Sequence, residues 1–183
     1  MLKQVSPGGS MIIAVTNRLV LRRFERSDAS FLLGLLNEPS YHANIGDRGI
    51  RSVAEAEDYL LTVLQRSYLE NGFGLYLVET HDGVPIGMSG LVNREGLEGI
   101  DLGYALLPSF WGKGYAREAC LAVMQHARQA CDLSELFAIV SRHNAASAKL
   151  LLRLDFALIG DFLHVDSGER LDLYRCNLFQ TDE

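Results

Sequence analysis

Residues 106–116 read LLPSFWGKGYA. Two leucines end an apolar segment, a turn containing Gly112 and Gly114 follows, and a segment with helical periodicity begins at Tyr115. This order predicts a strand, a glycine turn and the start of a helix. The first amides of a helix have no partner within the helix and lie at its positive end, so such a turn is suited to bind a phosphate or diphosphate. The spacing alone is equally compatible with an ordinary tight turn that carries solvated charges.

The distribution of charge favours anion binding at this turn. The 183-residue chain has a formal net charge of −6, which is not the basic field that a nucleic-acid-binding protein needs. Residues 108–153 nevertheless contain six Lys and Arg against three Asp and Glu, a charge of +3, so the rest of the chain carries −9. Lys113 and Arg117 stand in and beside the turn. We therefore expect one compact anionic ligand and no nucleic-acid partner.

Composition indicates the class of protein and its compartment. The length and a hydrophobic content of 48% predict one globular domain with a sizeable core. Cys120, Cys131 and Cys176 are odd in number and have no C-x-x-C spacing, so we expect no disulfide framework, no metal site and a reducing cytoplasm. The early apolar run is too short for a signal sequence or a membrane span, so no membrane partner is expected. The sequence does not distinguish a monomer from a homodimer.

Upstream of the glycine turn, the pattern predicts a meander of three antiparallel strands. These strands cover residues 73–79, 85–93 and 99–107, with turns at Asp82-Gly83 and Gly96. Before them we predict a strand over residues 19–24, a helix that begins at Ser27 and Asp28, and a loop over residues 37–51. A second helix begins at the capping box of Ser52 and Glu55, and its predicted buried face is Ala56, Tyr59, Leu60, Val63 and Leu64.

Downstream of the turn, helices and strands alternate. We predict helices over residues 115–131 and 145–154, and strands over residues 136–140, 157–163 and 171–177. The predicted order is β-α-α-β-β-β-α-β-α-β-β, an α/β fold with a mixed, mostly antiparallel sheet of about seven strands flanked by helices. Residues 1–16 are expected to form a flexible extension, residues 17–179 the domain, and residues 180–183 a tail.

The turn does not match two common phosphate-binding motifs. A Walker loop requires glycine where Leu107 stands, and a dinucleotide fingerprint requires a small residue where Arg117 stands. Residues 111–116, WGKGYA, instead resemble the pyrophosphate loop of the GNAT acyl-CoA N-acyltransferases, in particular the Rim-type branch of ribosomal-protein N-terminal acetyltransferases. Three further segments resemble this branch in the same order: residues 17–22 (NRLVLR), 102–104 (LGY) and 144–147 (NAAS). The resemblance covers residues 17–179.

The resemblance implies acetyl-CoA as co-substrate and no metal. It implies that the fourth and fifth predicted strands are splayed and that the pantetheine arm lies between them, bonded to the backbone around Leu106 and Leu107. The diphosphate is then held by the loop and its neighbours, namely Trp111, Gly112, Lys113, Gly114, Tyr115, Ala116, Arg117 and Asn144. The implied activity is acetyl transfer to a primary amine, first of all the α-amine of a protein or peptide. A small-amine acetyltransferase and a non-catalytic acyl-CoA-binding or sensing module are the alternatives.

Direct transfer to an amine needs a base, an oxyanion partner and a group that assists the departing sulfur. An α-amine with a pKa of about 7.7 to 8.0 is partly neutral at pH 7, whereas lysine with a pKa of about 10.4 is not. Asp101 is the predicted base, although a solvated strand aspartate is an equal alternative. Ser147 is the predicted proton donor or hydrogen-bond partner for sulfur; the alternative is a first-turn serine under an Asn144 N-cap. A backbone N–H near Leu106 is expected to stabilise the oxyanion.

Some positions depart from the family pattern. Many GNAT enzymes have a tyrosine acid seven residues after the asparagine, where this chain has Leu151. Rim-type sequences often read LEKLGF where residues 151–156 read LLRLDF, so the glutamate and the glycine are replaced. The resemblance places residues 37–51 and the helix after them in the acceptor wall, with Tyr41, His42 and Tyr104 as expected acceptor-binding residues.

Overall fold

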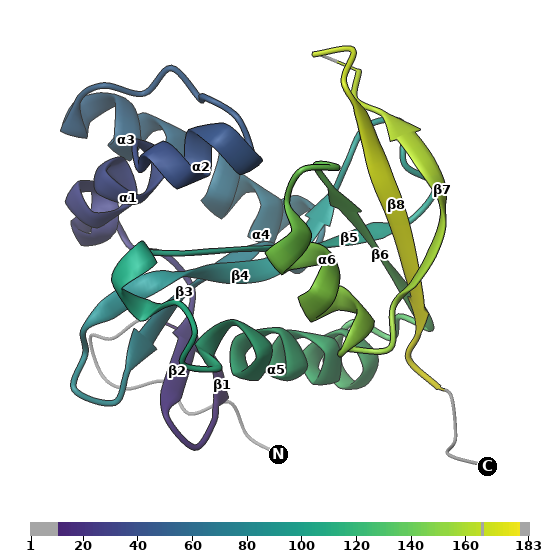
Figure 1. Cartoon of the computed structure of the whole chain (residues 1–183). Helices are drawn as coiled ribbons and strands as arrows, with labels where there is room; N and C mark the ends of the chain where they lie inside the picture. The colour runs from purple at the N-terminus through teal and green to yellow at the C-terminus, as the bar shows by residue number, and fades with distance from the viewer. Residues whose placement is uncertain (1–10, 166, 180–183) are drawn as a thin grey trace.

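The computed structural model describes residues 11–165 and 167–179. Its eight strands form one sheet in the order β1-β2-β3-β4-β5-β6-β8-β7, and only the β5–β6 pair is parallel (Figure 1). The strands are β1 (Ile12–Val15), β2 (Leu19–Arg22), β3 (Leu75–Thr80), β4 (Pro85–Asn93), β5 (Ile100–Leu106), β6 (Glu135–Val140), β7 (Ala157–Leu163) and β8 (Arg170–Asn177). The helices are η1 (Arg26–Asp28), α1 (Ala29–Leu36), α2 (Pro39–Asn44), α3 (Val53–Tyr59), η2 (Leu60–Gln65), α4 (Arg66–Glu70), η3 (Pro108–Phe110), α5 (Tyr115–Ala130) and α6 (Ala145–Leu152). The predicted α/β fold with a mostly antiparallel sheet is confirmed.

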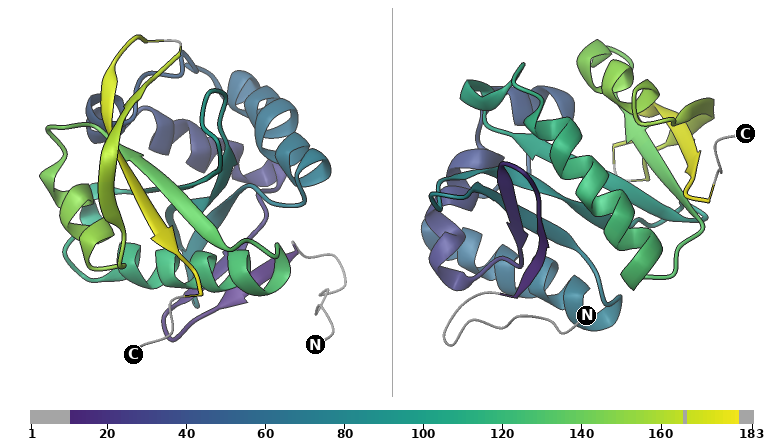
Figure 2. Two further views of the ribbon diagram at one scale, coloured as in Figure 1. Left: turned by 90° about the vertical axis from the view of Figure 1, so that its right-hand side faces the viewer. Right: turned by 90° about the horizontal axis from the view of Figure 1, so that it is seen from below.

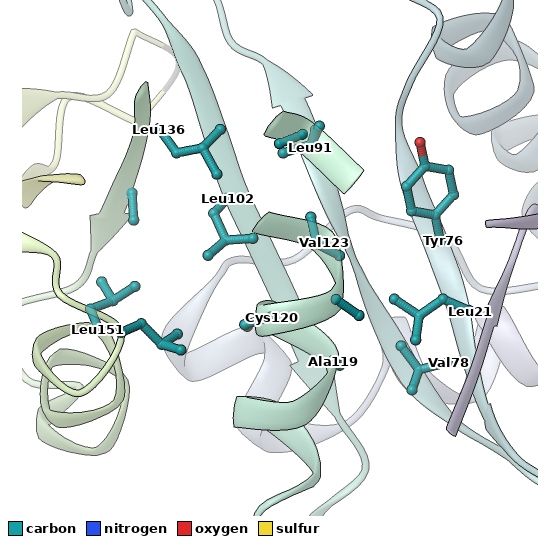
Figure 3. Close-up of a cluster of buried hydrophobic side chains, with 14 of the residues drawn as sticks. Leu21, Tyr76, Val78, Leu91, Leu102, Ala119, Cys120, Val123, Leu136 and Leu151 are labelled. Carbon is teal, nitrogen blue, oxygen red and sulfur yellow. The ribbon is translucent and has the colours of Figure 1, made fainter. Parts of the chain in front are cut away.

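The helices cover the two faces of the sheet. Helices α1 to α4 lie on one face and α5 on the other (Figure 1), and α5 runs across the sheet between the β1–β2 hairpin and α6 (Figure 2). The buried side of α5 includes Cys120 and Val123, which belong to one apolar cluster with Leu91 and Leu102 of the sheet (Figure 3). This packing fixes the start of α5 beside the end of β5, where the glycine turn lies.

The sheet begins earlier than the sequence predicted. Residues 12–15 were expected in a flexible extension, but they form β1, which pairs with β2 at the edge of the sheet. Four residues are too few to show a clear period of two, and the pairing depends on the turn at Thr16, whose N–H donates to the carbonyl of Leu19. Residues 12–15 therefore belong to the sheet; residues 1–10 and 180–183 lie outside the described residues.

The predicted loop over residues 37–51 contains a helix. Helix α2 begins with Pro39 at its first turn and buries Tyr41, which is 4% exposed. Its six residues are too short to produce a helical period in the sequence. The prediction of a continuous loop is therefore wrong for residues 39–44.

The helix that follows the capping box contains a π-helical segment. Ser52 and Glu55 form the predicted capping box, and helical structure continues from Val53 to Glu70, but residues Leu60–Gln65 are π-helical. The buried residues are Ala56, Leu60, Leu64 and Tyr68, which are four apart. Val63 was predicted to be buried and is 46% exposed, because the wider π turn rotates it away from the core.

The parallel strands β5 and β6 diverge after a single paired position. Only Asp101 and Phe137 are in register, near the start of both strands, and β5 continues to Leu106 without further pairing to β6. The expected opening between two splayed strands is thus present. The sequence predicted these two strands as the fourth and fifth. They are the fifth and sixth in the structure because β1 was not predicted.

Candidate active site

The opening between β5 and β6 forms part of a cavity of about 1490 Å³. The glycine turn, the start of α6 and helix α2 all contribute to its lining. Most of the predicted site residues line this one cavity: Asp101, Tyr104, Leu106, Trp111, Gly112, Gly114, Tyr115, Ala116, Arg117, Asn144, Ser147, Tyr41 and His42. Leu107 and Lys113 are the two predicted residues that do not line it.

The backbone of Leu106 is directed into the opening. Leu107 N–H donates to the carbonyl of Ile86 on β4, at a distance of 2.9 Å between nitrogen and oxygen. Because hydrogen bonds alternate between the two sides of an antiparallel strand, the N–H and carbonyl of Leu106 point away from β4, toward β6. The carbonyl of Leu106 accepts from Trp111 Nε1 at 2.8 Å. The Leu106 N–H is therefore placed to donate to a ligand in the opening.

Leu107 and Lys113 form hydrogen bonds with neighbouring backbone groups and do not line the cavity. The N–H of Leu107 is bonded to Ile86, and its carbonyl accepts from Phe110 N–H at 3.0 Å. Lys113 Nζ donates to the carbonyl of Ser109 at 3.0 Å, and the lysine is exposed outside the cavity. Both backbone groups of Leu107 thus have partners within the protein, whereas the Leu106 N–H faces the opening.

The glycine turn has the conformation that an anion-binding loop needs. Gly112 and Gly114 have φ angles of +71° and +80°, in the left-handed region that glycine adopts without strain. Gly114 is the N-cap of α5, a helix of 16 residues. Apart from Gly112 and its two chain neighbours, no described residue has an atom within 4 Å of the position that a Cβ of Gly112 would occupy, so the space beside this glycine is open. The residues present therefore fit a diphosphate at the positive end of α5.

Tyr104 and Ser147 meet across the opening. Tyr104 comes from β5 and Ser147 from the first turn of α6, and their hydroxyl oxygens are 2.5 Å apart. Burial raises the pKa of Tyr104, so its hydroxyl is protonated at neutral pH and can donate to Ser147 Oγ. Ser147 Oγ–H is then free to donate into the cavity. The Asn144 side chain accepts from the backbone N–H of Ser147 at 3.1 Å, so the cap uses the amide of Ser147 and leaves its hydroxyl for another role.

Asp101 is a buried carboxylate on the opposite face of β5. Its side chain is 2% exposed, and Arg94 Nε and Nη2 donate to Oδ2 at 2.9 and 2.7 Å. Among the described residues, Oδ1 has no hydrogen-bond partner. Burial raises the pKa of Asp101 to about 6, against the opposing effects of Arg94 and of the backbone N–H of Ile139. Asp101 is thus mostly ionised at pH 7 and can accept a proton. Arg94 was not among the predicted site residues, since a turn arginine carries no signal in the sequence.

A chain of polar contacts that the sequence did not reveal joins the side of the cavity that is lined by α2. His143 Nε2 lies 2.9 Å from the carbonyl of Ala43 on α2, and His143 Nδ1 lies 3.0 Å from Ser141 Oγ. Ser141 also donates to Glu169 of the β7–β8 loop at 3.0 Å. Nearby, His42 Nε2 lies 3.6 Å from Asp47 Oδ1. These contacts connect α2, where Tyr41 and His42 lie, to the segments around α6 and β8.

The cysteines do not offer a nucleophile. Cys120 is fully buried, and burial raises the pKa of its thiol to about 12. Burial also raises the thiol pKa of Cys131 and of Cys176. Within residues 11–165 and 167–179, no group of three His, Cys, Asp or Glu side chains is arranged to hold a metal. The helices of the same residues include none that is long and apolar enough to cross a membrane.

Comparisons with known proteins agree on one family. The model of the acetyltransferase (GNAT) domain matches residues 18–157. The uncharacterised N-acetyltransferase p20 of Bacillus licheniformis is 26% identical over 172 residues, which cover 91% of this chain and 96% of that protein. RimL, a ribosomal L7/L12 α-N-protein acetyltransferase solved with coenzyme A, has a TM-score of 0.78 at 21% identity, over 91% of this chain and 97% of RimL. A chimera of spermidine N-acetyltransferase SpeG from Vibrio cholerae and hSSAT has a TM-score of 0.72 at 19% identity, over 87% of this chain and 95% of the chimera.

Proposed function

Because the chain belongs to the GNAT acetyltransferase family, we propose that it transfers an acetyl group from acetyl-CoA directly to the α-amine of a protein or peptide. The observation that carries this proposal is the arrangement around β5. Leu102 and Leu106 of β5 face the α5 side of the sheet, and Ala105 faces the α1–α4 side. Because side chains alternate along a strand, Tyr104 lies on the α5 side and Asp101 on the α1–α4 side. A carboxylate and a hydroxyl pair thus approach one cavity from opposite faces of a strand.

The CoA-binding part of the site consists of Leu106, the glycine turn and the start of α6. The Leu106 N–H points into the opening, and the amides of residues 112–116 lie at the start of α5, where helical N–H groups have no partner within the helix. Arg117 lines the same cavity and adds positive charge for the diphosphate. Asn144 also lines it, but its side-chain oxygen is occupied by the cap of α6.

The residues divide the chemistry between them. When bound, acetyl-CoA supplies the thioester, whose C–S bond breaks as the new C–N bond forms. Asp101 accepts the proton that the amine loses, and Arg94 holds its other carboxylate oxygen in place. Leu106 N–H donates to the carbonyl oxygen where negative charge develops. Ser147, held by Tyr104, donates its hydroxyl hydrogen toward the departing sulfur.

The ionisation of the acceptor, rather than the charge of the cavity wall, favours an α-amine over a polyamine. Six acidic residues within the described part of the chain line the cavity. Asp47, Glu70 and Asp101 are paired with Arg51, Arg66 and Arg94, and Glu38, Glu95 and Glu169 line it as well. Hydrogen bonding from Arg51 lowers the pKa of Asp47 to about 2, so that this carboxylate stays ionised and paired. An α-amine is partly neutral at pH 7 and makes the smaller demand on a base.

A panel of acceptors tests the proposal. Release of the CoA thiol is followed with a short peptide that has a free N-terminus, the same peptide with a blocked N-terminus and an internal lysine, and spermidine. We expect turnover of the first peptide and none of the second. A higher kcat/KM for spermidine than for the peptide would instead identify a small-amine acetyltransferase. Spermidine is the amine in the name of the SpeG chimera. CoA binding without turnover of any amine would identify a binding module.

A further inference from the structure

Arg18, at the turn before β2, lies against the glycine turn. Its Nη1 donates to the carbonyl of Lys113 at 2.8 Å, and its guanidinium carbon lies 4.4 Å from the ring centroid of Tyr115. Nη2 is the nearest atom to the position that a Cβ of Gly114 would occupy, at 3.3 Å. One side chain, almost 100 positions away in the sequence, therefore contacts three consecutive residues of the turn.

Glu118, in the first turn of α5, anchors this arginine. Arg18 Nε donates to Glu118 Oε2 at 2.6 Å, while Arg18 N–H and Thr16 Oγ1 donate to Oε1 at 2.8 and 2.7 Å. Burial acts to raise the pKa of Glu118, but the hydrogen bonds from Thr16 and Arg18 outweigh it and lower the pKa. The ionised carboxylate thus holds the guanidinium in one place.

This contact fixes the orientation of one peptide group. In a trans peptide the carbonyl and the following N–H point in opposite directions. Because the Lys113 carbonyl is bonded to Arg18, the Gly114 N–H points away from Arg18. Gly112 and Gly114, with positive φ angles on both sides of Lys113, would otherwise let this peptide rotate at little cost.

We infer that Arg18 is a positioning residue for the diphosphate of CoA: it holds the peptide between residues 113 and 114 so that the Gly114 N–H faces the ligand. The inference rests on the proposed function. It also explains how a carboxylate is tolerated beside an anion site. Glu118 would repel a diphosphate at the start of α5, but it is paired with Arg18 and its charge is compensated.

The experiment measures binding rather than activity. CoA and dephospho-CoA, which keeps the diphosphate and lacks the 3′-phosphate, are titrated calorimetrically into the wild-type protein and into Arg18→Ala and Arg18→Lys. We expect Arg18→Ala to weaken both ligands by the same factor, about 10- to 100-fold. Arg18→Lys keeps the charge but cannot reproduce the guanidinium fork, so we expect it to weaken both ligands as well. Arg26→Ala, which removes an exposed ion pair with Glu57 elsewhere, is the matched control and should bind like wild type.

A second pair of variants separates orientation from charge. Glu118→Gln removes the repulsive charge, so a protein in which Arg18 only neutralises Glu118 should recover wild-type affinity in the Arg18→Ala, Glu118→Gln double variant. We expect no recovery, and recovery would overturn the inference. Wild-type affinity of Arg18→Ala or Arg18→Lys would also overturn it, as would a loss that affects CoA but not dephospho-CoA. If wild type itself bound neither ligand, the proposed function would fail first, and this inference with it.

Discussion

Replacement of Ser147 by alanine is a clean test of the proposed chemistry because the structure supplies a substitute for every contact that the hydroxyl makes. The helix cap uses the backbone N–H of Ser147, which alanine retains. The Tyr104 hydroxyl loses Ser147 Oγ but still lies 3.4 Å from the carbonyl oxygen of residue 147. No buried polar group is therefore left without a partner.

The expected effects on stability and on rate differ greatly in size. Losing one hydrogen bond costs about 0.5–1.5 kcal/mol, and the better helix propensity of alanine returns roughly 0.5 kcal/mol. The net change of at most about 1 kcal/mol shifts the Tm of a domain of this size by about 2–4 °C and leaves it folded at 25 °C. A lost transition-state donor, in contrast, lowers kcat by about 10²- to 10³-fold.

The assay is steady-state release of the CoA thiol with the acceptor identified above, combined with calorimetric CoA binding and thermal unfolding. We expect Ser147→Ala to lower kcat with little change in KM or in CoA affinity. Ser30→Ala, an exposed first-turn serine of α1, is the matched control. Tyr104→Phe should lower kcat less, and the double variant should resemble Ser147→Ala alone, since Tyr104 acts through Ser147. Wild-type kcat in Ser147→Ala would remove this hydroxyl from the mechanism.

Two further predictions concern the base and the glycine turn. Because the base must be deprotonated and burial raises the pKa of Asp101 to about 6, kcat/KM should rise with pH through about 6, below the titration of an α-amine. Asp101→Asn, which keeps an acceptor for Arg94, should lower the rate and abolish this inflection; an unchanged inflection would exclude Asp101 as the base. Gly112→Ala forces a non-glycine residue to a φ of +71° and should lower stability by about 1–2 kcal/mol. Gly83→Ala, at +76° in the β3–β4 turn, should cost the same, but only Gly112→Ala should weaken CoA, and equal CoA affinity of the two variants would argue against the loop.

Local sequence patterns predicted much of the fold. The capping box of Ser52 and Glu55, the three-strand meander and the start of α5 at Tyr115 are confirmed because each depends on neighbours within a few residues. The elements that were missed include β1, α2 and the π turn of η2. Strand β1 and helix α2 are too short for a period to be visible. The π turn changes the period itself, so a search at 3.6 residues assigned Val63 to the wrong face.

The candidate site was also predicted only in part. The sequence alone identified the glycine turn, the charge around it and the family resemblance, because these are properties of contiguous residues. Only the tertiary structure decided that Tyr104 meets Ser147, that Arg94 pairs with Asp101, and that Arg18 holds the turn. These partners come from different strands, turns and helices. They are brought together by the register of the sheet and by the divergence of β5 and β6 after Asp101, and both depend on packing between segments far apart in the chain.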